Sequence, residues 1–306
     1  MRPDSFRGIA LALTGALVLS PDTLFMRLSG LDAAQMMGWR GSLMAATLIL
    51  FWAATTRDRG GDLRCLITPA GLGAAACQGF NGMAFAYGIA VAPVSVVLFA
   101  LATVPIWSAA LGALVLGDRV GRATAITSAV VLAGIGLSVF SAEGGHGAGG
   151  SQPLIGALCG LAVAVAMAGS FTIYRARPAL PVPLTVGAGA AVFGAVGWAV
   201  AGPMTQTGGV LPAIWVCGVL ILPASFVLLS VASRHTPSAN VSLLLLLETA
   251  LGPILVWGFL GEAMTGPELV GGGIVVAALA VYLRHRRRVR EAPIAESSPP
   301  PPAPPR

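Results

Sequence analysis

The sequence contains no lysine and few charged residues of any kind. Charged side chains make up 10% of its 306 residues, and the mean hydropathy is +0.84. In ordinary soluble domains the charged share is about a quarter. This shortage excludes an ordinary soluble domain, in which charged side chains face water. It predicts an all-α integral membrane protein whose outer surface is solvated by lipid.

Residues that carry catalytic or metal chemistry are also scarce. The three histidines fall in predicted loops or in the tail, so a buried histidine-based acid–base pair or metal cluster is not expected. The four cysteines have no paired spacing and predict neither a disulfide framework nor a metal site. No nucleotide-binding motif of the GxxxxGK[ST] type occurs. We therefore expect no enzyme activity and no cofactor, and a chain powered by gradients or exchange.

Apolar stretches of about 20 residues, the length that crosses a bilayer, fill most of the chain. Ten such stretches predict ten transmembrane helices, near residues 8–28, 33–55, 71–89, 92–116, 123–140, 154–174, 183–201, 211–232, 238–260 and 268–283.

The arginines predict how these helices are oriented. With a cytoplasmic N-terminus, sixteen of the eighteen arginines fall in cytoplasmic segments, Arg27 lies outside and Arg40 lies within a helix. By the positive-inside rule, both termini are then cytoplasmic and the helix count is even. The net charge of +6 is explained by arginines that border the membrane, so no nucleic-acid partner is expected.

An internal repeat organises the chain. A shift of 144 residues places Pro93 on Pro237 and Gly117 on Gly261, together with the limits of the flanking apolar stretches. Five helices per copy force the second copy to enter the membrane from the opposite side. The predicted parts are a cytoplasmic N-terminus (1–7), a first repeat (8–140), an external connector (141–153), a second repeat (154–283) and a basic, proline-rich, disordered cytoplasmic tail (284–306).

The repeats resemble the EamA-type drug/metabolite transporter family. The resemblance rests on the L-G-[D/E] exits at 116–118 and 260–262, on Arg40, on Pro105 and on Glu248. Asp118 stands where the family usually has Glu, and Thr249 replaces the proline that often follows the acid. The resemblance implies a multi-pass inner-membrane carrier with alternating access that exports amino acids or related small metabolites. A channel or a non-transporting scaffold is the alternative, and an intramembrane enzyme is the least expected.

Glu248 is the first candidate for the transport site. It lies about 15 Å from a helix start near Ser238, which is half the depth of a ~30 Å hydrocarbon core. We expect it to bind a cationic group of the substrate or a proton that drives exchange; the alternative is a protonated glutamate that only joins helices. Gln78 and Asn81 lie three residues apart on one helix face and are expected to line the same cavity, or else to hydrogen-bond between helices.

Asp22 and Arg40 form a second constellation, because their predicted depths on adjacent helices are nearly equal. Equal depth allows an ion pair, which would act as a gate or would only fix packing. Three aromatic residues, Tyr87, Trp107 and Trp257, are candidates for an aromatic cavity lining, although packing and interface anchoring are commoner roles. Substrate identity, coupling ion and oligomeric state are left open by the sequence.

Overall fold

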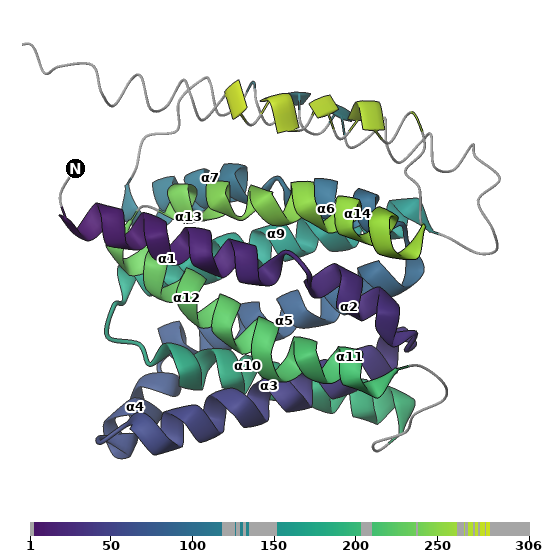
Figure 1. Ribbon diagram of the computed structural model, residues 1–306. Coiled ribbons are helices and arrows are strands. Elements are labelled where there is room, and N and C mark those ends of the chain that lie inside the picture. The colour runs from purple at the N-terminus through teal and green to yellow at the C-terminus, as the bar shows by residue number, and fades with distance from the viewer. Residues whose placement is uncertain are drawn as a thin grey trace, which may run out of the picture.

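The computed structural model describes residues 3–117, 152–202, 210–236 and 238–261, and scattered positions within 126–134 and 266–281. Within these ranges the regular elements are helices, without strands, and they run side by side as a bundle (Figure 1). The expected all-α fold is therefore seen. Most of the predicted fifth and tenth spans, most of the connector, Asp118, Glu262 and the tail from residue 282 lie outside the described residues.

Eight predicted spans lie in the described ranges. The helices that form them, with the short α4 between the second and third, are α1 (Pro3–Leu19) and α2 (Asp22–Ser29), α3 (Ala33–Thr55), α4 (Arg59–Leu66), α5 (Pro69–Val91), α6 (Val94–Leu101) and α7 (Val104–Leu116), α9 (Pro153–Ala176), α10 (Val182–Ala201), α11 (Leu211–Trp215) with a π-helix η1 (Val216–Ile221) and α12 (Leu222–His235), and α13 (Ser238–Leu244) with α14 (Leu246–Leu260).

Length and composition make five of the described helical stretches able to cross a membrane: Arg7–Ser29, Val94–Leu116, Pro153–Ala176, Val182–Ala201 and Leu211–His235. The chain is thus a multi-pass membrane protein. The count of ten spans and the cytoplasmic position of both termini stay predictions.

Several spans that the sequence predicts as single helices are interrupted. Pro21 has no N–H to donate and separates α1 from α2, while the Ser20 hydroxyl donates to the Ala16 carbonyl at 2.9 Å. Pro223 lacks the N–H that would bond the Val219 carbonyl, and the widened turns of η1 precede it. Leu245 separates α13 from α14.

The fourth and ninth predicted spans begin and end at corresponding residues, and each is interrupted near its middle. Val94 and Ser238 begin them, and Gly117 and Gly261, both with φ near +70°, end them. Each pair is separated by the same 144 residues. Left-handed backbone at a helix end suits glycine, because it has no Cβ to clash with the carbonyl.

Contacts between these two spans are reciprocal. Helix α6 packs on α14, and α7 packs on α13. The hydroxyls of Ser108 and Ser242 are 2.8 Å apart. Shifted by 144 residues, this pair becomes Gly252 and Leu98, and a Cβ placed on Gly252 would lie 2.6 Å from Leu98 Cδ1. Reciprocal contacts are what a two-fold relation between two copies produces, so they favour the predicted inverted repeat.

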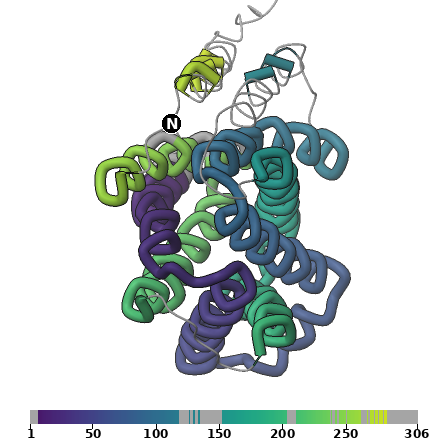
Figure 2. Tube along the Cα trace, turned by 90° about the vertical axis from the view of Figure 1, so that its right-hand side faces the viewer, coloured from purple at the N-terminus to yellow at the C-terminus, as the bar shows by residue number. Residues whose placement is uncertain are grey.

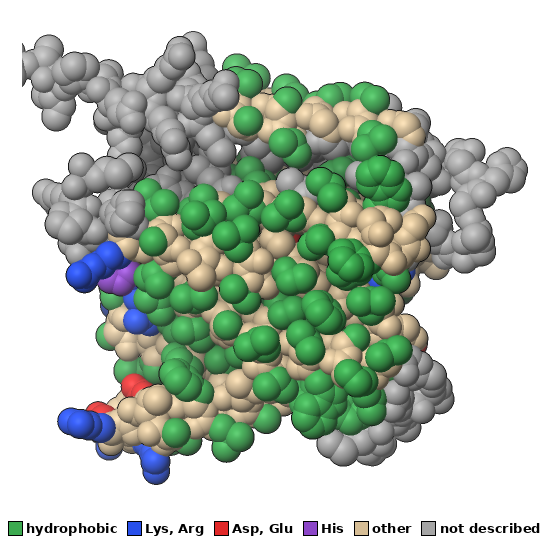
Figure 3. Space-filling model, viewed as in Figure 1, with side chains coloured by type: hydrophobic (Ala, Val, Ile, Leu, Met, Phe, Trp, Pro, Cys, Tyr) green, Lys and Arg blue, Asp and Glu red, His purple; other side chains and the backbone are tan. Residues whose placement is uncertain are grey.

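The outside of the bundle is largely apolar, as a lipid-facing surface requires. Among large apolar side chains, Leu114 is 82% exposed and Phe259 is 72% exposed. Figure 3 shows such side chains over the whole length of one face, while the blue arginine side chains gather at the end where α4 lies. One basic end is the distribution expected when one end of the bundle meets the cytoplasm.

Helices α3 and α10 approach each other more closely than any residue other than glycine allows. A Cβ on Gly41 would lie 2.4 Å from the Gly194 backbone, and one on Gly197 would lie 2.2 Å from the Gly38 nitrogen. Small residues let helix backbones meet in this way and replace a hydrophobic driving force that lipid does not supply. The contact joins the two predicted repeats (Figure 2).

Gly197→Ala should destabilise the protein by about 1–3 kcal/mol, because the added methyl group forces α3 and α10 apart. The thermal unfolding midpoint in detergent would show it. Gly258→Ala is the matched control, since a Cβ on Gly258 meets nothing within 4 Å. An equal midpoint for the two variants would contradict the close contact.

Candidate transport site

Five polar side chains predicted from the sequence line one cavity inside the bundle. Asp22 comes from α2, Arg40 from α3, Gln78 and Asn81 from α5, and Glu248 from α14. Each is at most 5% exposed. Polar groups in such a position are costly in an apolar interior unless they are paired or used. The structure therefore brings the Asp22–Arg40 pair into the same cavity as Glu248, although nothing in the sequence indicates that they meet.

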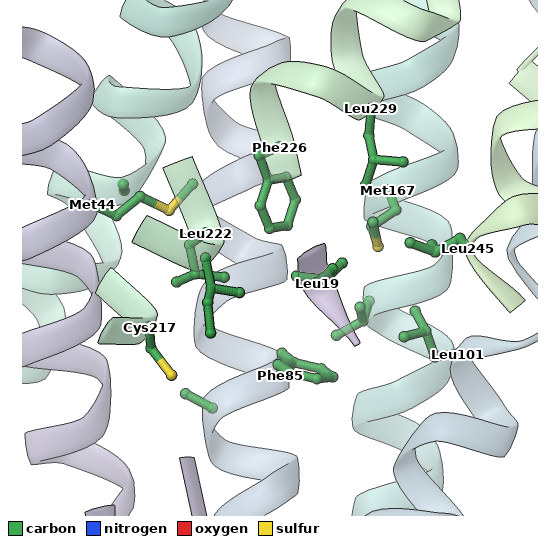
Figure 4. Packing of buried hydrophobic residues seen from close by; sticks show 14 of the residues in the cluster. Leu19, Met44, Phe85, Leu101, Met167, Cys217, Leu222, Phe226, Leu229 and Leu245 are labelled. Carbon is green, nitrogen blue, oxygen red and sulfur yellow. The ribbon is translucent and has the colours of Figure 1, made fainter. Parts of the chain in front are cut away.

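Apolar side chains complete the walls. Leu19, Met44, Phe85, Met167, Leu222 and Phe226 line the cavity, and Figure 4 shows them in the packed interior of the bundle. The cavity volume is about 30 Å³. That is room for about two water molecules or for one small charged group. The walls must separate before a whole metabolite can enter.

The Asp22–Arg40 ion pair crosses from α2 to α3. Arg40 Nη2 donates to Asp22 Oδ2 at 2.6 Å, and the guanidinium carbon lies 5.7 Å from the centre of the Phe85 ring. The break at Pro21 places Asp22 in the first turn of α2, where free N–H groups favour a negative charge. Asp22 Oδ1 and Arg40 Nε have no hydrogen-bond partner among the described residues.

Glu248 also stands in the first turn of a helix, because α14 begins at Leu246. Its Oε2 is buried and finds no hydrogen-bond partner in the described part of the chain. A half-helix whose N-terminus points into the membrane interior is a common way to build a transport site. The corresponding position of the first repeat is Val104, at the start of α7, so the acid belongs to the second repeat alone.

The three candidate aromatic residues do not line the cavity. Tyr87, Trp107 and Trp257 are 41%, 37% and 54% exposed on the outside of the bundle. Their large rings have apolar faces that lipid can cover, which fits the commoner role as packing or interface residues. The expectation that these three residues line the cavity is corrected: the aromatic rings in its walls are those of Phe85, Phe193 and Phe226.

Helical spacing could have found part of this lining. Phe85 lies four residues after Asn81 and seven after Gln78, and these offsets share one helix face. Phe193 had no comparable signal, because its helix offers no polar residue at these offsets. Phe226 shares a helix face with Ser230 and Ser233, but serine is a weaker signal, since its hydroxyl can bond its own helix backbone, as Ser233 does with the Ser230 carbonyl. Residues Leu222 and Phe226, just after η1, also escaped notice, because periodicity does not foresee a π-helix.

Residues 6–140 match the model of the EamA-like transporter family. This match supports an EamA-type family member. It confirms the resemblance noted from the sequence motifs over residues 6–140. Proteins of this family are membrane transporters of the drug/metabolite type, with a small-molecule substrate, and not enzymes.

The fold likeness extends over both halves of this EamA-type chain. A solved structure titled only "Crystal structure of protein" aligns with 94% of it, and with 99% of its own length, at a TM-score of 0.65. Sequence identity is 18%, so the likeness concerns the fold alone. No curated protein matches the chain.

Two further arginines join segments at opposite ends of the bundle. Arg27, at the end of α2, donates through Nη2 to the Ala92 carbonyl at 2.8 Å, next to the start of α6. Arg234, in the last turn of α12, donates to the Leu180 carbonyl in the loop before α10. In the sequence, both arginines are seen only as charges that border the membrane. They hold the bundle together on either side of the cavity.

Arg40→Gln should destabilise the protein by about 3–5 kcal/mol, because it leaves Asp22 buried without its partner. The double variant Asp22→Asn with Arg40→Gln should lose less, since no lone charge is left. Thermal unfolding of both single variants and the double variant in detergent measures the coupling. Additive losses would show that the two side chains do not act as a pair.

Proposed function

We propose that this EamA-type chain is a secondary active transporter that exports a small metabolite across the inner membrane by alternating access. The cargo class suggested by the family resemblance is an amino acid or a related compound. The observation that carries the proposal is Glu248, a buried acid that lines the cavity and whose Oε2 has no hydrogen-bond partner among the described residues. Gln78 and Asn81 line the same cavity and supply further hydrogen-bonding groups.

The cost of the site argues against a merely structural cavity. An acid or arginine at the centre of a membrane costs about 2.5–3.5 kcal/mol on insertion scales. The Asp22–Arg40 pair offsets its own cost through the bond between its members. Glu248 has no such compensation among the described residues, so stability gives no reason for an acid there.

The small size of the cavity supports a carrier over a channel. The cavity is too small for a metabolite, and arginine bonds join neighbouring segments at both ends. In a carrier, this arrangement is the occluded state, from which one end opens at a time. We propose that Arg27 leaves the Ala92 carbonyl when the external end opens. Arg234 would leave the Leu180 carbonyl when the cytoplasmic end opens.

The proposed orientation places the basic end of the bundle in the cytoplasm, with both termini on that side. The clustering of arginine side chains at the end of the bundle where α4 lies supports this orientation (Figure 3). A proton or a counter-substrate would drive export, because nucleotide-binding motifs are absent from the sequence.

Glu248→Gln should lower export at least tenfold while the protein still folds, because the amide keeps the shape of the side chain but has no charge. Cells that express the parent, the variant or no transporter are compared by the metabolites that accumulate in the medium. The cargo is the compound that only the parent raises. Asp32→Asn is the matched control, since Asp32 caps α3 away from the cavity and asparagine also caps helices.

Unchanged export by Glu248→Gln, at equal amounts of protein in the membrane, would sink the proposed role of this acid. Saturable flux that an opposing substrate stimulates would distinguish the carrier from a channel. A flux that rises linearly with cargo concentration would favour the channel.

A further inference from the structure

The charges around the cavity can be counted, and one negative charge is left over. Asp22 and Arg40 cancel each other across their 2.6 Å bond. Glu248 stands apart from this pair, and its Oε2 is an acceptor without a donor among the described residues. With Glu248 ionised, the cavity carries a net charge of −1. With Glu248 protonated, it is neutral.

We propose that Glu248 binds the ammonium group of a monovalent organic cation that has no carboxylate, and that this cargo and one proton occupy the carboxyl group by turns. The inference rests on the proposed function and names its cargo class. It narrows the amino acids and related compounds of the family resemblance to amines.

The free acceptors suit an ammonium group. An ammonium has three N–H donors and no acceptor. Glu248 Oε2 and Asp22 Oδ1 are both buried acceptors without a donor among the described residues, and Gln78 and Asn81 line the same cavity. The volume of about 30 Å³ fits such a headgroup and little more. The rest of the cargo therefore meets the walls only after they move.

Net charge disfavours an amino acid. A zwitterion adds no net charge, so the cavity would keep its −1 unless Glu248 were protonated. An uncompensated charge in an apolar interior costs several kcal/mol. The carboxylate of a zwitterion would also need a donor, and Nη2 of Arg40 already donates to Asp22 while the guanidinium lies over the Phe85 ring. A simple ammonium cation leaves the cavity neutral and makes no such demand.

The remainder of the cargo is expected to be apolar. The rings of Phe85, Phe193 and Phe226 line the cavity, and Met44 and Met167 add polarisable surface. A hydrocarbon or aromatic body fits these walls.

Exchange at one carboxyl group has a fixed stoichiometry. A buried carboxyl without a partner is cheaper in its neutral form, so the empty site holds a proton. When the cargo binds, the O–H bond breaks, the proton leaves to water, and the carboxylate accepts the N–H donors of the ammonium. One positive charge replaces another, so exchange is one for one and electroneutral.

The groups that act on this carboxyl are few. Asp22 and Arg40 influence Glu248 electrostatically. Among the helices that pack against α14, α6 and α13 carry no titratable side chain. The other two helices that pack against α14 are α1 and α2, and their titratable side chains are Asp4, Arg7, Asp22 and Arg27.

Three probes with a phenyl ring separate the charge types: phenethylammonium, phenylalanine and 3-phenylpropionate. Binding to the full-length protein in detergent is measured by calorimetry, and proton release by a pH indicator in weakly buffered solution. We expect phenethylammonium to bind at least tenfold more tightly than phenylalanine, and 3-phenylpropionate not to bind. We expect about one proton to be released for each cation bound.

Two variants keep the experiment decisive. Glu248→Gln should lose at least tenfold in affinity for phenethylammonium and release no proton, while its thermal unfolding shows a folded protein. Glu248→Asp keeps a carboxyl group and should still release a proton, with weaker binding. Asp32→Asn should match the parent in both readouts.

The outcomes separate this inference from the proposed function. Phenylalanine binding as tightly as phenethylammonium, or phenethylammonium binding without proton release, overturns the inference even if export of a metabolite is confirmed. No binding of phenethylammonium to the folded parent overturns it as well. Tight binding of phenethylammonium with proton release by the purified protein would support the inference. If cells that express the same protein export nothing, the proposed transport function is contradicted while the inference stands.

Discussion

A charge inside an apolar bundle needs a partner, and most of the site follows from that constraint. Arg40 and Asp22 meet it for each other at 2.6 Å. Their pairing is what leaves Glu248 as the unmatched group of the cavity. If Arg40 instead paired with Glu248, Asp22 on α2 would be the lone acid. The choice of partner therefore sets which helix carries the unmatched acid.

Broken helices make this arrangement affordable in free energy. Asp22 stands in the first turn of a half-helix, where the positive end of the helix dipole lowers the cost of a negative charge. Glu248 stands in the first turn of α14, and its N–H donates to the Leu245 carbonyl at 3.0 Å. Pro21 explains the first break by removing a donor. The second, at Leu245, falls in a leucine run without proline or glycine. The first repeat breaks at Ala102 and Thr103, just beyond Leu101, the residue that a shift of 144 aligns with Leu245. Both copies therefore break near the middle of the same span.

Much of this could be predicted from the sequence, because lipid imposes simple rules. Helix lengths follow from bilayer thickness, and the polar residues of the cavity were visible as rare exceptions in apolar stretches. The Asp22–Arg40 contact followed from equal depth. What could not be predicted depends on rotation about helix axes: the exposed faces of Tyr87, Trp107 and Trp257, and the inward faces of Phe193 and Phe226. In spans that are apolar all round, periodicity does not mark the inner face.

The two halves share a frame but not a chemistry, and this asymmetry has a mechanistic consequence. In the proposed carrier, reciprocal contacts such as Ser108 with Ser242 would give the bundle two related ways to open, one toward each side of the membrane. The charged groups do not repeat, since Val104 stands where the second half has Glu248. A symmetric frame around a single unpaired acid would therefore present the same site to both sides in turn. Two acids would bind two cations at once, whereas one acid must release what it holds before it can bind again, which is the requirement of obligatory exchange.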